Sequence, residues 1–196
     1  MAQRRPAADR PDDLGPYVVA AQQGDEHAFE TLYVKVQPGL LRYLRVLVGA
    51  DAEDVAAETW LQIARDLPRL RDTSGFQSWA ATTARTRAMD HLHQRKRRPG
   101  VPAPTEDLAQ VAAQYRDAAD DLTDPVSTDA ALALIASLPA DQAEAILLRV
   151  VMGLDNNAAA AVMHKRPRAV RVTAQRGLRR LAELLSQIPD LPPGDR

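Results

Sequence analysis

The distribution of proline constrains this chain more than any other feature, because proline lacks a backbone N–H and disfavours the interior of helices and strands. Of the 14 prolines, three lie before residue 17, four between residues 99 and 125, and three after residue 188. Two proline-poor segments remain, residues 17–98 and 128–188. This pattern predicts two folded domains joined by a linker over residues 99–127, with disordered ends at 1–16 and 189–196.

Both segments are expected to be helical, since no stretch alternates apolar and polar residues over the length of a strand. In the first segment, we expect one helix after Asp25 with a kink or break at Pro38. A second helix is expected to be capped by Asp51 and to end at Pro68. A third begins near Phe76, behind a threonine or serine cap, and runs into a cluster of basic residues.

In the second segment, Pro139 stands at the first turn of a helix that is expected to stop at Gly153. A short helix over residues 156–163 follows, and a longer one from Pro167 to about Ser186. The predicted fold is therefore all-α, with two small helical domains joined by an acidic flexible linker. The second domain is expected to contain a helix-turn-helix.

Residues 154–181 carry the clearest functional pattern, because a short helix of small residues, a turn and a basic helix follow one another. From His164 to Arg180 there are seven basic residues and no acidic one. At about 100° per residue, the arginines and Gln175 gather on one face of the last helix. Such a face fits the major groove of DNA, whereas the alternative is a charged face that only meets solvent. The opposite face is apolar and consists of Val170, Ala174, Leu178, Leu181 and Leu185.

Residues 51–98 combine an acidic helix start, a loop with aromatic residues and a basic helix end. Four acidic residues and no basic one lie between Asp51 and Glu58. Basic groups beside Phe76 and Trp79 are typical of contacts to unstacked single-stranded bases, with core packing as the alternative for each ring. We expect Trp60, which lies within a helical apolar stripe, to be in the core.

The chain resembles bacterial RNA polymerase sigma factors of the extracytoplasmic-function (ECF) subfamily. Residues 51–65 resemble the region that binds the polymerase clamp, residues 69–98 the promoter −10 region, and residues 138–181 the −35 domain. His164 stands where this family usually has glycine, which predicts a less common backbone conformation there. The motifs that carry the resemblance are Trp79, Thr83-Ala84-Arg85, Asp90-His91-Leu92, Leu138-Pro139, Asp141-Gln142, Leu147-Leu148-Arg149, Gly153-Leu154 and Ala169-Val170-Arg171.

The resemblance implies a factor that binds core RNA polymerase at its clamp helices and flap and directs it to promoters, with an anti-sigma factor as a further partner. The implied −35 contacts are Lys165, Arg166, Arg168, Ala169, Arg171, Val172, Gln175, Arg176 and Arg179. The implied −10 contacts are Arg71, Asp72, Thr73, Ser74, Phe76, Trp79, Arg85, Arg87, His91, Arg95 and Arg98. The implied polymerase contacts are Asp51, Glu53, Asp54, Glu58 and Gln62. The acidic linker would follow the path of RNA through the polymerase.

Other classes of protein fit the sequence less well. The chain has no cysteine, which excludes disulfides, thiolate zinc sites and cysteine nucleophiles, and no catalytic motif is present. We therefore expect no enzyme, metal, cofactor or small-molecule substrate. No long apolar run and no signal-peptide pattern occurs, so we expect a cytoplasmic protein without membrane insertion. The alternatives are a stand-alone helix-turn-helix regulator that works without polymerase and a purely structural helical adaptor.

Overall fold

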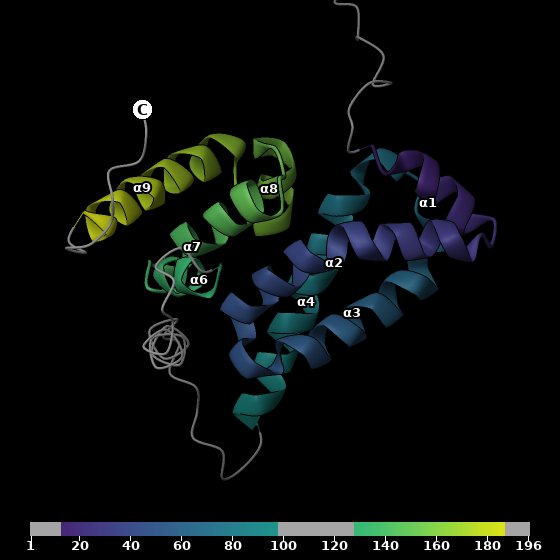
Figure 1. The fold of residues 1–196 in the computed structure, drawn as a ribbon, viewed down its shortest axis with the longest axis horizontal. Coiled ribbons are helices and arrows are strands. Elements are labelled where there is room, and N and C mark those ends of the chain that lie inside the picture. Colours follow the sequence, from purple (N-terminus) through teal and green to yellow (C-terminus); the bar gives the residue numbers. More distant parts are fainter. Residues whose placement is uncertain (1–12, 98–127, 187–196) are drawn as a thin grey trace, which may run out of the picture.

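The computed structural model describes residues 13–97 and 128–186, and the structural statements below concern these residues alone. Every regular element among them is a helix (Figure 1). The acidic linker, Arg98 and both terminal arms lie outside the described residues, except that the first helix already begins at Gly15. The predicted boundary at residue 17 is therefore two residues too late. No described helix is long and apolar enough to cross a membrane.

The N-terminal domain contains helices α1 (Gly15–Gln22), α2 (Glu26–Val48), α3 (Ala52–Asp66) and α4 (Phe76–Arg97). Short 3-10 turns connect them at Gly49–Asp51, Leu67–Arg69 and Thr73–Gly75. Helices α2, α3 and α4 pack against one another around a core of fully buried side chains (Figure 1). Examples of these core residues are Leu32, Leu40, Tyr43, Leu44, Ile63 and Phe76.

Two of the predicted helix features of this domain need correction. Asp25 caps α2 as predicted, since its carboxylate accepts from the Ala28 N–H. However, α2 continues through Pro38 without a break. The buried apolar residues on both sides of this proline hold the two halves in one helix despite the missing backbone donor. Asp51 precedes α3 but makes no side-chain cap hydrogen bond, because its carboxylate contacts α4 instead.

The C-terminal domain contains α6 (Thr128–Ala136), α7 (Ala140–Ile146), α8 (Asn156–Met163) and α9 (Pro167–Leu185), with a π-helical continuation of α7 at Leu147–Val151. The predicted stop at Gly153 is confirmed, and this glycine has a positive φ of 67°. The predicted bounds of α8 are confirmed as well. Pro139, expected in the first turn, lies at the N-cap position of α7.

The turn between α8 and α9 has the unusual backbone that its sequence predicts. His164 has φ 53° and ψ 40°, in the left-handed region that glycine adopts more readily. Helices α7 and α9 then pack closely, since a Cβ added at Gly177 would lie 2.7 Å from Ile146 Cδ1. The helix-turn-helix is therefore held against the rest of its domain by a contact with no room for a larger residue at Gly177.

The two domains pack on each other. Helix α4 contacts α8, and α2 contacts both α6 and the π-helical turn that follows α7. Figure 1 shows the C-terminal helices, coloured green to yellow, beside α2 and α4. The sequence pattern did not predict this arrangement, in which one face of the N-terminal domain is covered by the C-terminal domain.

Candidate nucleic-acid and polymerase interfaces

Helix α9 presents the basic face that the sequence predicts. Eight of the nine predicted −35 residues are exposed, and Val172 is half-buried. Arg166, Arg168, Ala169, Val172, Thr173 and Arg176 line one shallow hollow on this face. Thr173 was not among the predicted contacts, although it lies about one turn along α9 from both Ala169 and Arg176, which were. The exposed arginines of this face can meet phosphates and base edges together, whereas Lys165 pairs with Asp141 of α7, with Nζ 2.5 Å from Oδ2.

The opposite side of α9 is buried only over its first half. Val170 is fully buried and Ala174 is 7% exposed, whereas Leu178 is 47% exposed. Leu178 therefore lies on the predicted apolar face but not in the core. Further along α9, Leu181 and Leu185 of this face are half-buried, and Leu181 packs against the core.

The loop before α4 is held in shape by one aspartate. Asp72 Oδ1 accepts from Ser74 Oγ at 2.7 Å and from the Gly75 N–H at 3.3 Å, and the bond from Ser74 lowers the pKa of Asp72. Arg71, Asp72 and Ser74 are exposed, and Thr73 is half-buried. The implied −10 contacts at residues 71–74 thus form a compact, largely exposed turn at the start of α4.

The aromatic side chains of this region are less exposed, and so less able to contact bases, than the sequence suggested. Phe76 is fully buried, so its predicted contact with bases is wrong for this arrangement. It closes the core at the start of α4, which leaves no surface of the ring for a base. Trp79 is half-buried, with its ring centroid 5.9 Å from that of Phe76. The predicted core position of Trp60 is confirmed, since it is 7% exposed.

The basic side chains of α4 that belong to the predicted −10 set all have partners within the protein. Arg85 pairs with Glu144 of α7, and Arg87 donates to Gln62 of α3. His91 Nε2 lies 2.9 Å from Asp51 Oδ2, and Arg95 contacts the same carboxylate. The structure therefore joins residues of the predicted −10 set to Asp51 and Gln62 of the predicted polymerase set.

The remaining three predicted polymerase contacts form an acidic, exposed edge on α3. Glu53, Asp54 and Glu58 point to solvent, and Glu53 lies 3.8 Å from Arg45 in an exposed ion pair. With Asp51 and Gln62 turned toward α4, the exposed charge of α3 is negative. This edge can attract a basic partner surface at a distance.

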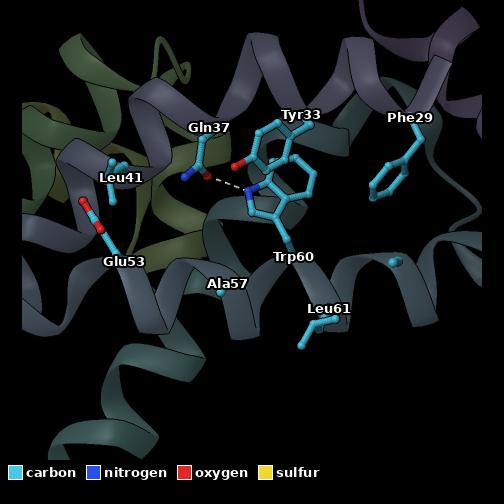
Figure 2. A pocket seen from close by; sticks show the side chains of 9 residues that line it. Phe29, Tyr33, Gln37, Leu41, Glu53, Ala57, Trp60 and Leu61 are labelled. Atoms are coloured by element: carbon cyan, nitrogen blue, oxygen red, sulfur yellow. Dashed lines mark hydrogen bonds between the residues drawn. The ribbon is translucent and has the colours of Figure 1, made fainter. Parts of the chain in front are cut away.

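Beside this acidic edge lies an apolar groove between α2 and α3, which the sequence analysis missed (Figure 2). Trp60 forms its floor, with its ring 4.9 Å from that of Tyr33 and 5.9 Å from that of Phe29, and its Nε1 donates to Gln37 Oε1. Leu61 is 59% exposed. The spacing of Phe29, Tyr33, Gln37 and Leu41 along one helix face was the available signal. The groove is lined by Phe29, Tyr33, Gln37, Leu41, Glu53, Ala57, Trp60, Leu61 and Ala64.

Comparison with known proteins decides the family. Residues 32–98 match the family model for Sigma-70 region 2, and residues 128–181 match the model for Sigma-70, region 4. The ECF RNA polymerase sigma factor ShbA of Streptomyces griseus is 33% identical, over 89% of this chain and 96% of that protein. The chain belongs to the ECF family of RNA polymerase sigma factors. It is also 32% identical to the ECF sigma factor BldN of Streptomyces coelicolor, over 93% of this chain and 70% of that protein.

The fold is shared with two solved structures. CnrH, in complex with the cytosolic domain of CnrY, matches with a TM-score of 0.62 at 21% identity, over 89% of this chain and 98% of that one. RpoE from Bartonella quintana, in complex with the anti-sigma factor NepR, matches with a TM-score of 0.60 at 20% identity, over 82% and 98%. In this sigma factor, region 2 therefore corresponds to α2–α4 and region 4 to α6–α9.

Proposed function

We propose that this sigma factor directs core RNA polymerase to promoters by reading the −35 element with α9 and the −10 element with the 71–74 loop and α4. The observation that carries the proposal is the exposed arginine face of α9 at the end of a helix-turn-helix. Arg168, Arg171 and Gln175 lie near the start and middle of this helix, where a recognition helix reaches base edges. Arg176 and Arg179 lie further along and are placed to contact phosphates.

Core polymerase is proposed to bind the acidic edge of α3 together with the groove beside it. Glu53, Asp54 and Glu58 supply charge that steers a basic surface into place, and the groove supplies apolar area for a stable contact. Neither domain alone has a large recognition surface. Binding to polymerase would fix the spacing of the two domains and so combine two weak DNA contacts into one strong one.

An anti-sigma factor is a proposed further partner. CnrH and RpoE, which share this fold, were each solved with a protein partner, CnrY and the anti-sigma factor NepR. A protein that covers α9 or the acidic edge of α3 would block the proposed interfaces. The expected compartment is the cytoplasm, where core polymerase works.

In vitro transcription with core polymerase on a library of promoter fragments tests this function. The expected result is a set of transcripts that requires both polymerase and this chain, and whose templates share two sequence elements at a fixed spacing. Specific binding to those templates by the chain alone, with transcription unchanged when it is omitted, would instead support the stand-alone regulator.

A further inference from the structure

We propose that the free sigma factor is held in a closed form by a contact centred on Glu144, and that this contact must break before both promoter elements are read. The inference rests on the proposed function of α4 and α9. It concerns how the two domains sit before polymerase and DNA are bound.

The centre of the contact is a carboxylate shared by two residues of the other domain. Glu144 Oε1 of α7 accepts from the Tyr43 O–H at 2.9 Å and from Arg85 Nε at 2.7 Å. Glu144 is 8% exposed and Tyr43 is fully buried. Burial raises the pKa of Tyr43, and the adjacent Glu144 carboxylate raises it further, so the phenol keeps its proton and donates. We call these three residues the Glu144 contact.

Two further contacts lie beside it. Gln77 Nε2 of α4 donates to the Met152 carbonyl at 2.6 Å. Gly39 of α2 is so close to Met152 that an added Cβ would lie 3.1 Å from Met152 Sδ and 3.9 Å from Met152 Cα. The domains therefore meet over side chains and backbone from α2, α4, α7 and the turn after α7.

In this arrangement the two DNA-reading surfaces are too close together to reach both promoter elements. Positions −10 and −35 are by their numbering about 25 base pairs apart, and at about 3.4 Å per base pair this is roughly 85 Å of B-DNA. Helix α4 is about 33 Å long and α9 about 28 Å long, from 22 and 19 residues. Because α4 packs against α8, and only the short turn at residues 164–166 joins α8 to α9, the two reading surfaces cannot be that far apart. Reading both elements requires the domains to separate.

The Glu144 contact also uses a residue of the proposed −10 surface. The carboxylate occupies the Arg85 guanidinium as a DNA phosphate would, so Arg85 cannot serve both partners at once. A buried ion pair is often close to neutral in free energy, because desolvation offsets the attraction. Separating the domains returns both charged groups to water, so opening costs only this small net free energy and is reversible when polymerase binds.

A disulfide across the domain contact tests the requirement for opening. The chain has no cysteine, so Gly39→Cys with Met152→Cys creates a single pair of thiols, and the Met152 side chain that would meet the new Cβ is removed. We expect the oxidised variant to lose promoter-dependent transcription at least tenfold and dithiothreitol to restore it. Equal transcription from the oxidised and reduced protein would overturn the inference. Failure of the wild-type chain to support transcription would instead count against the proposed function.

Removing the carboxylate tests the role of Glu144 without polymerase. For Glu144→Gln we expect a larger radius of gyration in small-angle X-ray scattering and about tenfold tighter binding to promoter DNA at low salt, as follows if the open, binding-competent population rises by that factor. Glu30→Gln is the matched control, because Glu30 is exposed and pairs only with exposed His27. Tyr43→Phe keeps the ring in the core, removes one donor, and should shift both measurements the same way. If both Glu144→Gln and Tyr43→Phe match the control, the Glu144 contact does not hold the closed form.

Discussion

His91 and Asp51 join the end of α4 to the start of α3, with Nε2 of the histidine 2.9 Å from Oδ2 of the aspartate. Arg95 contacts the same carboxylate from one turn further along α4. The sequence suggested separate roles for these residues, with Asp51 facing polymerase and His91 and Arg95 facing DNA. In the free protein they fix the angle between the two helices that carry those surfaces.

This cluster predicts a pH-dependent loss of stability in Asp51→Asn. The hydrogen bond from His91 lowers the pKa of Asp51 against partial burial, and the charge of Arg95 lowers it further. A lowered folded-state pKa contributes stability above the unfolded value of about 3.9, and this is lost as pH falls through the folded value. Asp51→Asn should lower the free energy of unfolding by about 0.5–1 kcal/mol at pH 7 and by less at pH 3.

Urea denaturation at both pH values measures this effect. Asp54→Asn is the control, because Asp54 lies three residues after Asp51, in the first turn of α3, and is exposed. An equal loss at pH 3 and pH 7 for Asp51→Asn would show that the carboxylate charge is not involved.

The α9 face predicts two different responses to loss of arginine. Arg171→Ala should weaken binding of holoenzyme to a cognate promoter by about 1–3 kcal/mol and relax the preference at one position of the −35 element. Arg179→Ala should weaken binding to all sequences alike and reduce the salt slope by about one unit. Salt titrations on matched and mutated promoters separate the two effects, with Lys35→Ala on α2 as a control. Cognate binding unchanged by both arginine substitutions would remove α9 from the −35 contact.

The acidic edge of α3 predicts a loss of docking without a loss of stability. Asp54→Lys with Glu58→Lys should reduce core polymerase binding at least tenfold, because both side chains are exposed and charge reversal repels a basic partner surface. The melting temperature should change little. Glu30→Lys with Glu183→Lys makes the same change in net charge elsewhere and should bind normally. Docking lost equally in both double variants would assign the effect to net charge alone.

The turn between α8 and α9 predicts an order of stability among variants at residue 164. His164 holds a left-handed conformation that costs a residue with a Cβ about 1 kcal/mol or more, and a β-branched residue most. His164→Val should therefore unfold at lower urea than His164→Gly, by about 1–2 kcal/mol in free energy. Because His164 is exposed, the loss of a buried contact does not contribute to the difference in stability between the two variants. Equal stability of the two variants would contradict the backbone explanation.

Local signals in the sequence were enough to place most helices. Asp25, Gly153 and Pro167 mark helix ends because a cap, a positive φ and a missing N–H act on neighbouring residues only. The exposed face of α9 was predictable for a similar reason, since a 19-residue helix repeats its pattern several times. Pro38 shows the limit of this reasoning. The buried residues on both sides of it keep α2 continuous, although proline disfavours the interior of a helix.

Contacts between distant parts of the chain could not be predicted. Glu144 lies 101 residues from Tyr43 and 59 from Arg85, and one chain without repeats contains no signal that pairs them. The burial of Phe76 and the turning of Asp51 toward α4 depend on the same tertiary packing. In each case the prediction gave the side chain an external partner, whereas in the structure it contacts other residues of the protein.

The central claim is that region 2 reads −10 and region 4 reads −35 within one polymerase complex. A DNA-cleaving iron chelate tethered at a single cysteine maps this directly, since the natural chain has none. Thr86→Cys on α4 and Arg180→Cys on α9 place the probe on exposed positions outside the proposed contact sets. We expect the α4 probe to cut promoter DNA near −10 and the α9 probe to cut it near −35. Cleavage of the same element by both probes, or the reverse assignment, would contradict it.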